Sequence, residues 1–305
     1  MAESAPRSTD TRDGVLCGLG AYVLWGVFPV YFKLVEEVAA GEVLLHRIIW
    51  AVPFGALILS VRGQWRELRD ALRDLRNLRW LMLSALCITW NWFIYIWAVV
   101  NERIFETSLG YYINPLIYVL VGVVLFHERL RRLQMLAVLL ASIGVLVLIL
   151  QGGVVPWVSL SLAASFTAYG VIRKQVPIGA MPGLFVETVL LFPIAAGALL
   201  WLMLTQQAAF PGAGGSTQAL LMLAGPVTVV PLLLFAIATR RLFLTTIGFM
   251  QFLAPTLQFI TAVYFGEELG AARVFCFAFI WAAVLVFSVD ALRAGQRQRR
   301  ALRSA

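Results

Sequence analysis

Ten apolar segments dominate this sequence, and each is long enough to cross a bilayer as a helix. A helical span needs about 20 mostly apolar residues, because the hydrocarbon core of a bilayer is about 30 Å thick. The apolar runs therefore predict an all-α integral membrane protein with ten transmembrane helices. The predicted spans are 14–34, 42–61, 79–100, 104–126, 132–150, 154–172, 180–204, 217–238, 242–265 and 272–292.

The composition excludes a water-soluble domain. Hydrophobic residues make up 61% of the chain and charged residues 13%, whereas soluble domains carry about 25% charged residues. The net charge of +8 is spread over short loops and the end of the chain. We therefore expect anionic lipid headgroups as a partner, and no nucleic acid.

The basic residues predict the orientation in the membrane. Of the 24 Lys and Arg residues, 20 lie in one set of alternate gaps between the spans and three in the opposite gaps, while Arg47 lies within a span. Cytoplasmic loops of membrane proteins carry the excess of Lys and Arg. Both termini are therefore predicted to be cytoplasmic, in a multi-pass protein of the plasma (inner) membrane.

The sequence contains an internal duplication. Residues 105–130 align with 243–270, with a two-residue insertion before the proline, and Pro53 aligns with Pro193 at the resulting offset. Each half holds five predicted spans, so equivalent helices cross the membrane in opposite senses, as in the inverted repeats of secondary transporters. The predicted units are a tail (1–13), a first repeat (14–150), a second repeat (154–292) and a basic tail (293–305).

The sequence lacks the motifs of metal sites, nucleotide-binding sites and hydrolytic enzymes. The three cysteines lie in apolar spans without paired spacing, and no His or Cys motif has the spacing of a metal site. No nucleotide-binding loop or nucleophile elbow is present. We therefore expect no enzyme, metal or cofactor. Segment 62–78 places Arg and acidic residues among Leu and Trp at helical spacing, which predicts a helix on the cytoplasmic membrane surface.

Several short motifs carry a family resemblance. They are Trp25-Gly26, Leu45-His46-Arg47, Asn91-Trp92, Trp97-Ala98-Val99, Ser108-Leu109-Gly110-Tyr111-Tyr112-Ile113-Asn114-Pro115-Leu116, Glu187-Thr188, Pro231-Leu232-Leu233-Leu234-Phe235, Gly248-Phe249-Met250-Gln251 and Ala254-Pro255-Thr256. With Glu128 and Glu268 after the fourth and ninth spans, they resemble the RarD branch of the drug/metabolite transporter superfamily, which has paired EamA-type domains. The resemblance covers residues 14–292 and implies a permease. The superfamily exports amino acids, metabolites and drugs, and the branch is associated by name with chloramphenicol sensitivity.

The candidate charged residues within predicted spans are Arg47, Glu106 and Glu187. A charge costs about 2.5–3.5 kcal/mol at a helix centre and normally faces a partner or a cavity. Arg47 and Glu187 occupy equivalent repeat positions at different depths, which disfavours a direct salt bridge between them. We expect Arg47 to pair with Glu106 near the outer face, and Glu187 with Arg240 or Arg241 near the inner face. These groups are interpreted as gates or solute contacts, or as pairs that only lock helix packing.

A candidate substrate site is predicted near the midplane, where polar and aromatic residues of both repeats share one depth. These residues are Trp25, Asn91, Trp92, Tyr95, Tyr111, Asn114, Tyr169 and Gln251. Small-molecule pockets combine apolar walls with a few placed polar groups, but the same residues could serve only to pack helices. Pro115 and Pro255 lie at equivalent span centres, where a proline bends a helix and frees a carbonyl. They are predicted hinges, or kinks that neighbouring helices accommodate.

The predicted function is a secondary transporter that moves a small metabolite or drug-like solute by alternating access around this site. The alternative is a membrane sensor or chaperone-like factor that transports nothing. A channel is disfavoured, because no filter motif or ring-forming acidic cluster is apparent. The solute, the direction of transport, ion coupling and the oligomeric state stay open at this point.

Overall fold

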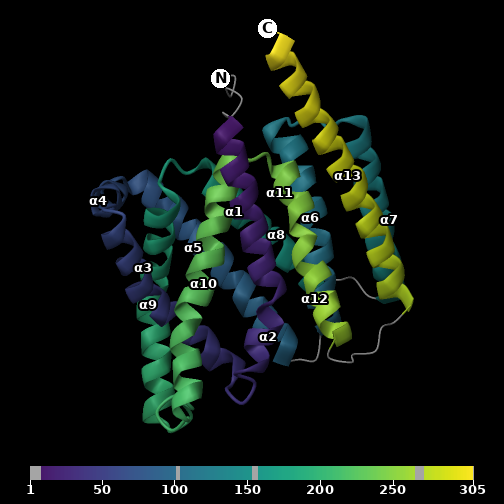
Figure 1. The fold of residues 1–305 in the computed structure, drawn as a ribbon. Helices are drawn as coiled ribbons and strands as arrows, with labels where there is room; N and C mark the ends of the chain where they lie inside the picture. Colours follow the sequence, from purple (N-terminus) through teal and green to yellow (C-terminus); the bar gives the residue numbers. More distant parts are fainter. Residues whose placement is uncertain (1–7, 101–103, 153–156, 265–270, 305) are drawn as a thin grey trace.

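Helices and turns make up the part of the chain that the structure describes. The computed structural model describes residues 8–100, 104–152, 157–264 and 271–304 (Figure 1). Within these ranges there is no strand, which confirms the all-α prediction. Helices are the expected outcome, because a backbone surrounded by lipid must form its hydrogen bonds within its own segment.

Each predicted span is occupied by one helix or by two consecutive helices. The helices are α1 (Ser8–Gly26), α2 (Phe28–Lys33), α3 (Ala40–Val61), α4 (Trp65–Arg73), α5 (Leu75–Val100), α6 (Ile104–Phe126), α7 (Arg132–Gly152), α8 (Trp157–Gln175), α9 (Ala180–Leu204), α10 (Gly215–Arg241), α11 (Leu244–Gln251), α12 (Leu253–Tyr264) and α13 (Ala271–Ser304). Among the described residues, five stretches are long and apolar enough to cross a membrane. They are Thr11–Lys33, Ala40–Val61, Ala180–Leu204, Gly215–Arg241 and Val274–Ala294.

Two of the predicted spans are each broken into two helices. The chain leaves α1 at Val27, and Pro29 lies in the first turn of α2. It leaves α11 at Phe252, three residues before Pro255 in the first turn of α12. A proline in the first turn of a helix removes no hydrogen bond of that helix. The breaks therefore precede these prolines.

Helix α4 is a short amphipathic helix beside the bundle. It buries Leu68 and Ala71 and exposes its basic side chains. The surface helix predicted over 62–78 is therefore shorter than expected, since it ends at Arg73. The Asp74 carboxylate accepts hydrogen bonds from two backbone N–H groups of the following turn, at 2.9 and 3.3 Å. It thereby caps a new helix, α5.

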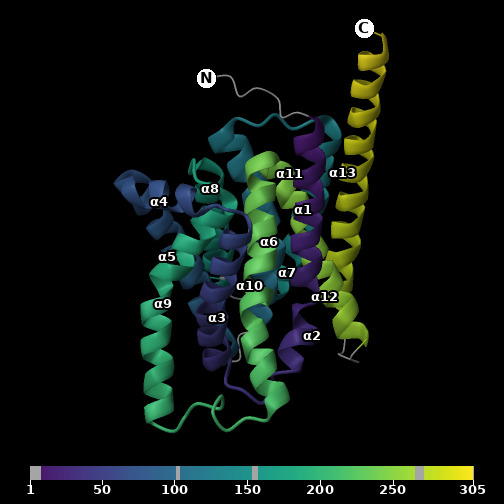
Figure 2. The same cartoon turned by 60° about the vertical axis from the view of Figure 1, so that its left-hand side comes forward.

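The helices form a bundle in which segments far apart in the sequence are neighbours. Helix α3 packs against α9 and α10, α5 against α8, α6 against α8 and α11, and α7 against α13. Figures 1 and 2 show the start of α1 and the end of α13 at the same end of the bundle. Aromatic side chains fill the core, where Tyr22, Tyr118, Tyr169 and Phe235 are fully buried.

Candidate functional site

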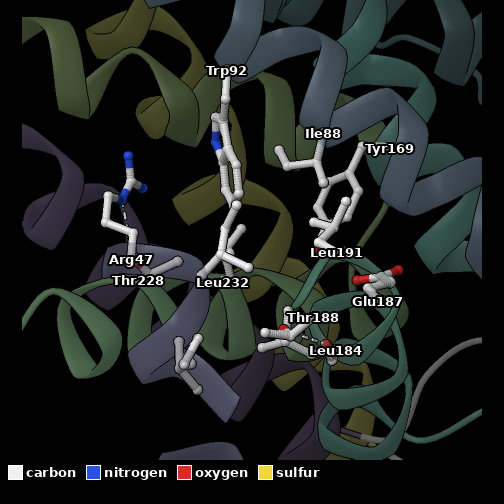
Figure 3. Close-up of a pocket in the computed structure, with 13 residues that line it drawn as sticks. Arg47, Ile88, Trp92, Tyr169, Leu184, Glu187, Thr188, Leu191, Thr228 and Leu232 are labelled. Carbon is white, nitrogen blue, oxygen red and sulfur yellow. Dashed lines mark hydrogen bonds between the residues drawn. The ribbon is translucent and has the colours of Figure 1, made fainter. Parts of the chain in front are cut away.

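A small cavity lies between helices that come from both halves of the sequence. Its volume is about 20 Å³, which is enough for about one water molecule. Helices α3, α5, α8, α9 and α10 contribute to its wall. The lining residues are Arg47, Ile48, Ala51, Ile88, Trp92, Tyr169, Leu184, Glu187, Thr188, Leu191, Thr228, Val229 and Leu232 (Figure 3).

Most of these lining residues occupy matching positions in the two halves of the chain. The matched positions, each pair 140 residues apart, are 47 and 187, 48 and 188, 51 and 191, 88 and 228, and 92 and 232. The same offset aligns Pro53 with Pro193. The wall is therefore built from corresponding faces of α3 and α9, and of α5 and α10.

On one side of the cavity, the carboxylate of Glu187 pairs with the guanidinium of Arg173. The Oε1 and Nη1 atoms are 3.5 Å apart, and both side chains are almost fully buried. The hydroxyls of Ser84 and Tyr169 face the same carboxylate. However, no described residue gives either carboxylate oxygen a hydrogen bond of good geometry. The pair therefore balances charge and leaves hydrogen-bonding capacity unused.

Arg173 fits between α8 and α9 because residue 183 has no side chain. Its Nη2 donates a hydrogen bond to the backbone carbonyl oxygen of Ala180, 2.7 Å away. A Cβ atom added to Gly183 would overlap the guanidinium group. The glycine is thus a condition for burying this arginine.

The partner of Glu187 differs from the sequence-based expectation, which was Arg240 or Arg241. Arg240 instead donates to backbone carbonyls of the turn between α8 and α9, and Arg241 pairs with Asp13 at 3.6 Å. The physical reason is proximity. Only four residues separate α8 from α9, so the last turn of α8 lies beside the first turns of α9.

In Figure 3, Arg47 and Glu187 lie on opposite sides of Trp92. Its Nε donates a hydrogen bond to Oγ1 of Thr228, 2.9 Å away. The guanidinium carbon lies 5.1 Å from the centre of the Trp92 ring and 5.9 Å from the ring centres of Phe28 and Phe32. Within the described ranges of the chain, no carboxylate forms an ion pair with it.

Three tyrosines stand around Arg47. Tyr31, Tyr95 and Tyr111 are close enough to interact electrostatically with its charge. The ring centres of Tyr95 and Tyr111 are 6.3 Å apart, and 39% of the surface of Tyr111 is exposed. The side chain of Glu106 lies outside the described residues, so its pairing with Arg47 stays a prediction.

Two amides of the predicted midplane site are engaged in contacts between helices. The Nδ2 of Asn91 donates to the carbonyl oxygen of Leu162 at 2.8 Å and to Oγ of Ser165 at 3.0 Å. The hydroxyl of Thr167 donates to Oδ1 of Asn114 at 2.9 Å. Both amides thus join α8 to its neighbours, α5 and α6. This arrangement favours the packing interpretation of these two residues.

The other predicted residues lie in several places. Trp92 and Tyr169 line the cavity. Trp25 packs among the buried aromatic rings. Gln251 is buried at the end of α11, and no described residue donates a hydrogen bond to its Oε1. The predicted hinge residue Pro115 lies inside α6, which continues through it. The eight predicted residues therefore do not form a single cluster around the cavity.

Polar side chains of this region that were not predicted as site residues include Arg173 and Thr228. Arg173 was assigned to a cytoplasmic loop, because it and Lys174 follow the apolar residues of a span. The sequence did contain a signal for Arg173. A buried acid at position 187 needs a basic partner, and Gly183, one turn before Glu187 in α9, leaves room for one. Thr228 gave no such signal, because isolated threonines are compatible with any apolar helix.

Two carboxylates connect the halves of the chain outside the cavity. Glu128, which follows α6, accepts hydrogen bonds from two backbone N–H groups at the start of α11, at 2.7 and 3.0 Å. Glu42 of α3 accepts two from the turn between α9 and α10, at 2.8 and 2.9 Å. Figure 1 shows that turn and the start of α11 at opposite ends of the bundle. Each end therefore has its own carboxylate link between the halves.

Known proteins match the chain over most of its length. Residues 12–150 match the EamA-like transporter family. The chain is 48% identical to an uncharacterized transporter of Pseudomonas aeruginosa, covering 95% of this chain and 98% of that protein. It is 43% identical to Protein RarD of Escherichia coli, covering 94% and 97%. It is 35% identical to the chloramphenicol-sensitive protein RarD of Pseudomonas aeruginosa, again covering 94% and 97%.

A solved crystal structure of another protein has a similar fold. The TM-score is 0.67 at 19% sequence identity, and the match covers 90% of this chain and 97% of the other. This likeness concerns the fold alone, whereas the identities to RarD proteins extend over nearly the whole sequence. The chain therefore belongs to the RarD branch of the EamA-like, drug/metabolite transporter superfamily, whose members are multi-pass membrane transporters.

Proposed function

We propose that the protein is a secondary transporter that moves a small metabolite or drug-like solute across the plasma (inner) membrane by alternating access. The observation that carries this proposal is the cavity, which is lined by matching positions of the two halves. Solute sites of inverted-repeat transporters lie at the interface between the repeats. Membership of a transporter family supports the same function.

The two halves, 14–150 and 154–292, are proposed to be five-helix repeats of opposite orientation. The pattern of helix contacts supports this, if α1 corresponds to α8, α3 to α9 and α5 to α10. The contact between α1 and α10 then has its counterpart between α8 and α5, and the contact between α3 and α10 has its counterpart between α9 and α5. Ten spans result when α1 with α2, and α11 with α12, each count as one and the short surface helix α4 is left out.

Alternating access requires the halves to separate at one end at a time. A cavity of about 20 Å³ holds about one water molecule, so an organic solute enters only after the surrounding helices move apart. The links made by Glu128 and Glu42 lie at opposite ends and would have to break in turn. Arg47, Glu106 and Glu187 are proposed as gate or solute contacts on either side of the site.

The end that holds the start of α1 and the end of α13 is proposed to face the cytoplasm. The asymmetry of 20 against three basic residues supports this orientation, and it would place the basic loops against anionic lipid headgroups. Reporter fusions at positions 70 and 130 should give cytoplasmic signals, and fusions at 152 and 212 extracytoplasmic signals. A cytoplasmic signal at 152 would contradict the inverted repeat.

The test of function is solute flux into proteoliposomes that contain the purified protein. We expect saturable uptake, and exchange with preloaded vesicles, for at least one solute in a panel of amino acids, organic acids and chloramphenicol-like drugs. The substitution Trp92→Ala should strongly reduce flux per folded protein, because Trp92 lines the cavity. Trp90→Ala is the matched control, since Trp90 is two residues away on α5 and 51% exposed.

The alternative function, a membrane sensor or chaperone-like factor, predicts a different outcome of the same assay. Folded protein would then give neither uptake nor exchange with any member of the panel. Equal losses of flux in the two tryptophan variants would show that transport does not depend on the cavity, and would contradict the proposed site.

A further inference from the structure

We infer that the solute of this cavity is an organic anion with an apolar body, bound through the guanidinium of Arg47. The inference rests on the proposed transport function and specifies its substrate class. It starts from the balance of charge around the cavity, which is uneven between the two sides.

In the described part of the chain, three charged side chains lie at the cavity or next to it. Arg47 and Glu187 line its wall, and Arg173 pairs with Glu187. The charges of that pair cancel, so among the described side chains one positive charge remains, on Arg47. An uncompensated charge within a membrane protein is costly. A bound anion would relieve this cost, whereas a bound cation would increase it.

The guanidinium of Arg47 is oriented and still has free donors. Its Nε bond to Thr228, 2.9 Å long, fixes the plane of the group. In the described part of the chain, no residue accepts a hydrogen bond from either of its Nη groups. Two parallel N–H donors in one plane match the two oxygens of a carboxylate. A carboxylate, or a similar planar anion, is therefore the head group that fits.

The surroundings of Arg47 define the rest of the solute. Ring faces of Trp92, Phe28 and Phe32 lie within 5.9 Å of the guanidinium carbon. They attract the cation through their quadrupoles but do not neutralise it. Trp92 also lines the cavity, so its ring offers a stacking surface to an aromatic or other flat apolar body.

The opposite side of the cavity offers hydrogen-bond acceptors without a free charge. The oxygens of Glu187 and the hydroxyl of Tyr169 are buried and lack hydrogen bonds of good geometry among the described residues. A neutral hydroxyl or amide N–H on the far end of the solute would satisfy them. A second, cationic group on the solute would have to compete with Arg173 for Glu187. The net charge that suits the site is therefore negative.

The test compares aromatic acids with their own primary amides. The probes are benzoate, 4-hydroxyphenylacetate and indole-3-acetate, each beside its amide, with tryptamine as a cation. Binding to purified protein in nanodiscs is measured by titration calorimetry. At least one acid should bind at least about tenfold more tightly than its amide, as a charge-assisted bidentate contact implies. Tryptamine should bind no more tightly than the amides.

Variants assign the preference to one residue. Arg47→Gln should remove the preference for the acid, and Arg47→Lys should retain part of it, because charge persists without the planar pair of donors. Arg69→Gln, on the exposed face of α4, removes the same charge away from the cavity and should leave the preference unchanged. Thermal unfolding establishes that each variant is folded.

Defined outcomes overturn the inference. They are equal binding of every acid and its amide, no binding of any acid, or a preference that survives Arg47→Gln. Flux then separates this inference from the proposed function. Flux of neutral solutes without preference for acids rejects the inference and leaves the transporter. Selective binding of acids without flux or exchange supports the inference and rejects the transporter.

Discussion

The two sides of the cavity carry opposite charges at the same position of the repeated sequence, but in different surroundings. Glu187 has a buried partner, Arg173, at 3.5 Å. Arg47, 140 positions earlier, has a hydroxyl and three ring faces. Residues 24–27 (Leu-Trp-Gly-Val) align with 168–171 (Ala-Tyr-Gly-Val), and the same offset places Pro29 where α8 has Arg173. Equivalent positions of the two halves thus both carry a charge, but their neighbours differ. Helix α8 supplies an opposite charge to Glu187, and no described residue supplies one to Arg47.

The largest effect should come from breaking the compensated side. Arg173→Gln leaves the Glu187 carboxylate buried without an opposite charge, which should lower the free energy of unfolding by about 3–5 kcal/mol. The double variant Arg173→Gln, Glu187→Gln should recover most of this loss. Unfolding in detergent micelles measures both. A double variant as unstable as the single one would show that the ion pair does not cause the loss.

A smaller effect is expected from filling the space beside Arg173. In Gly183→Ala the new Cβ meets the guanidinium, and the displacement should cost about 1–3 kcal/mol of unfolding free energy. Gly197→Ala on the same helix is the control, because nothing lies within 4 Å of its added Cβ. That substitution should stabilise by about 0.4–1 kcal/mol. Changes of the same sign in both variants would contradict the close approach.

Substitution on the Arg47 side of the cavity should change stability much less. Arg47→Gln loses the hydrogen bond to Thr228 but also removes an intramembrane charge, so the unfolding free energy should change by no more than about 1 kcal/mol. The same unfolding assay tests whether Arg47 pairs with Glu106, as predicted from the sequence. That pair requires a large loss in Arg47→Gln, relieved by adding Glu106→Gln.

The smallest effects are expected for the amides that join helices. Asn91→Ala removes two hydrogen bonds between helices and Asn114→Ala removes one, and such bonds average about 0.6 kcal/mol in membranes. Flux in proteoliposomes should fall only in proportion to folded protein. A loss of flux per folded molecule would restore their interpretation as solute contacts and extend the site beyond the cavity.

The fold was largely predictable, because membrane thickness sets the length of each helix. The segment predicted at 180–204 coincides with α9 end to end, and the one at 104–126 with α6. Bends were predicted at Pro115 and Pro255, but only Pro255 lies beside a break, at Phe252, and the break at Val27 was not predicted. A proline in the first turn of a new helix and a proline inside a continuous helix, such as Pro115, look alike in a sequence.

The candidate site was predictable only in part. Arg47 and Glu187 are unusual within apolar spans, and this is why sequence analysis identified them. The positions of Asn91 and Asn114 within their spans predicted a depth near the midplane. The neighbours of a side chain also depend on the direction in which it points, and that direction is set by helix packing. Ordinary residues such as Ile88 complete the cavity wall and carry no signal of their own.

The fit of Arg173 against Gly183 also limits how sequences of this kind can diverge. A side chain at position 183 occupies the space of the guanidinium, so it is tolerated only after Arg173 is lost. Loss of Arg173, in turn, is tolerated only after Glu187 becomes neutral. The order of substitutions is therefore constrained, and a library that randomises all three positions should return Arg173 only together with Gly183, and Glu187 only together with Arg173.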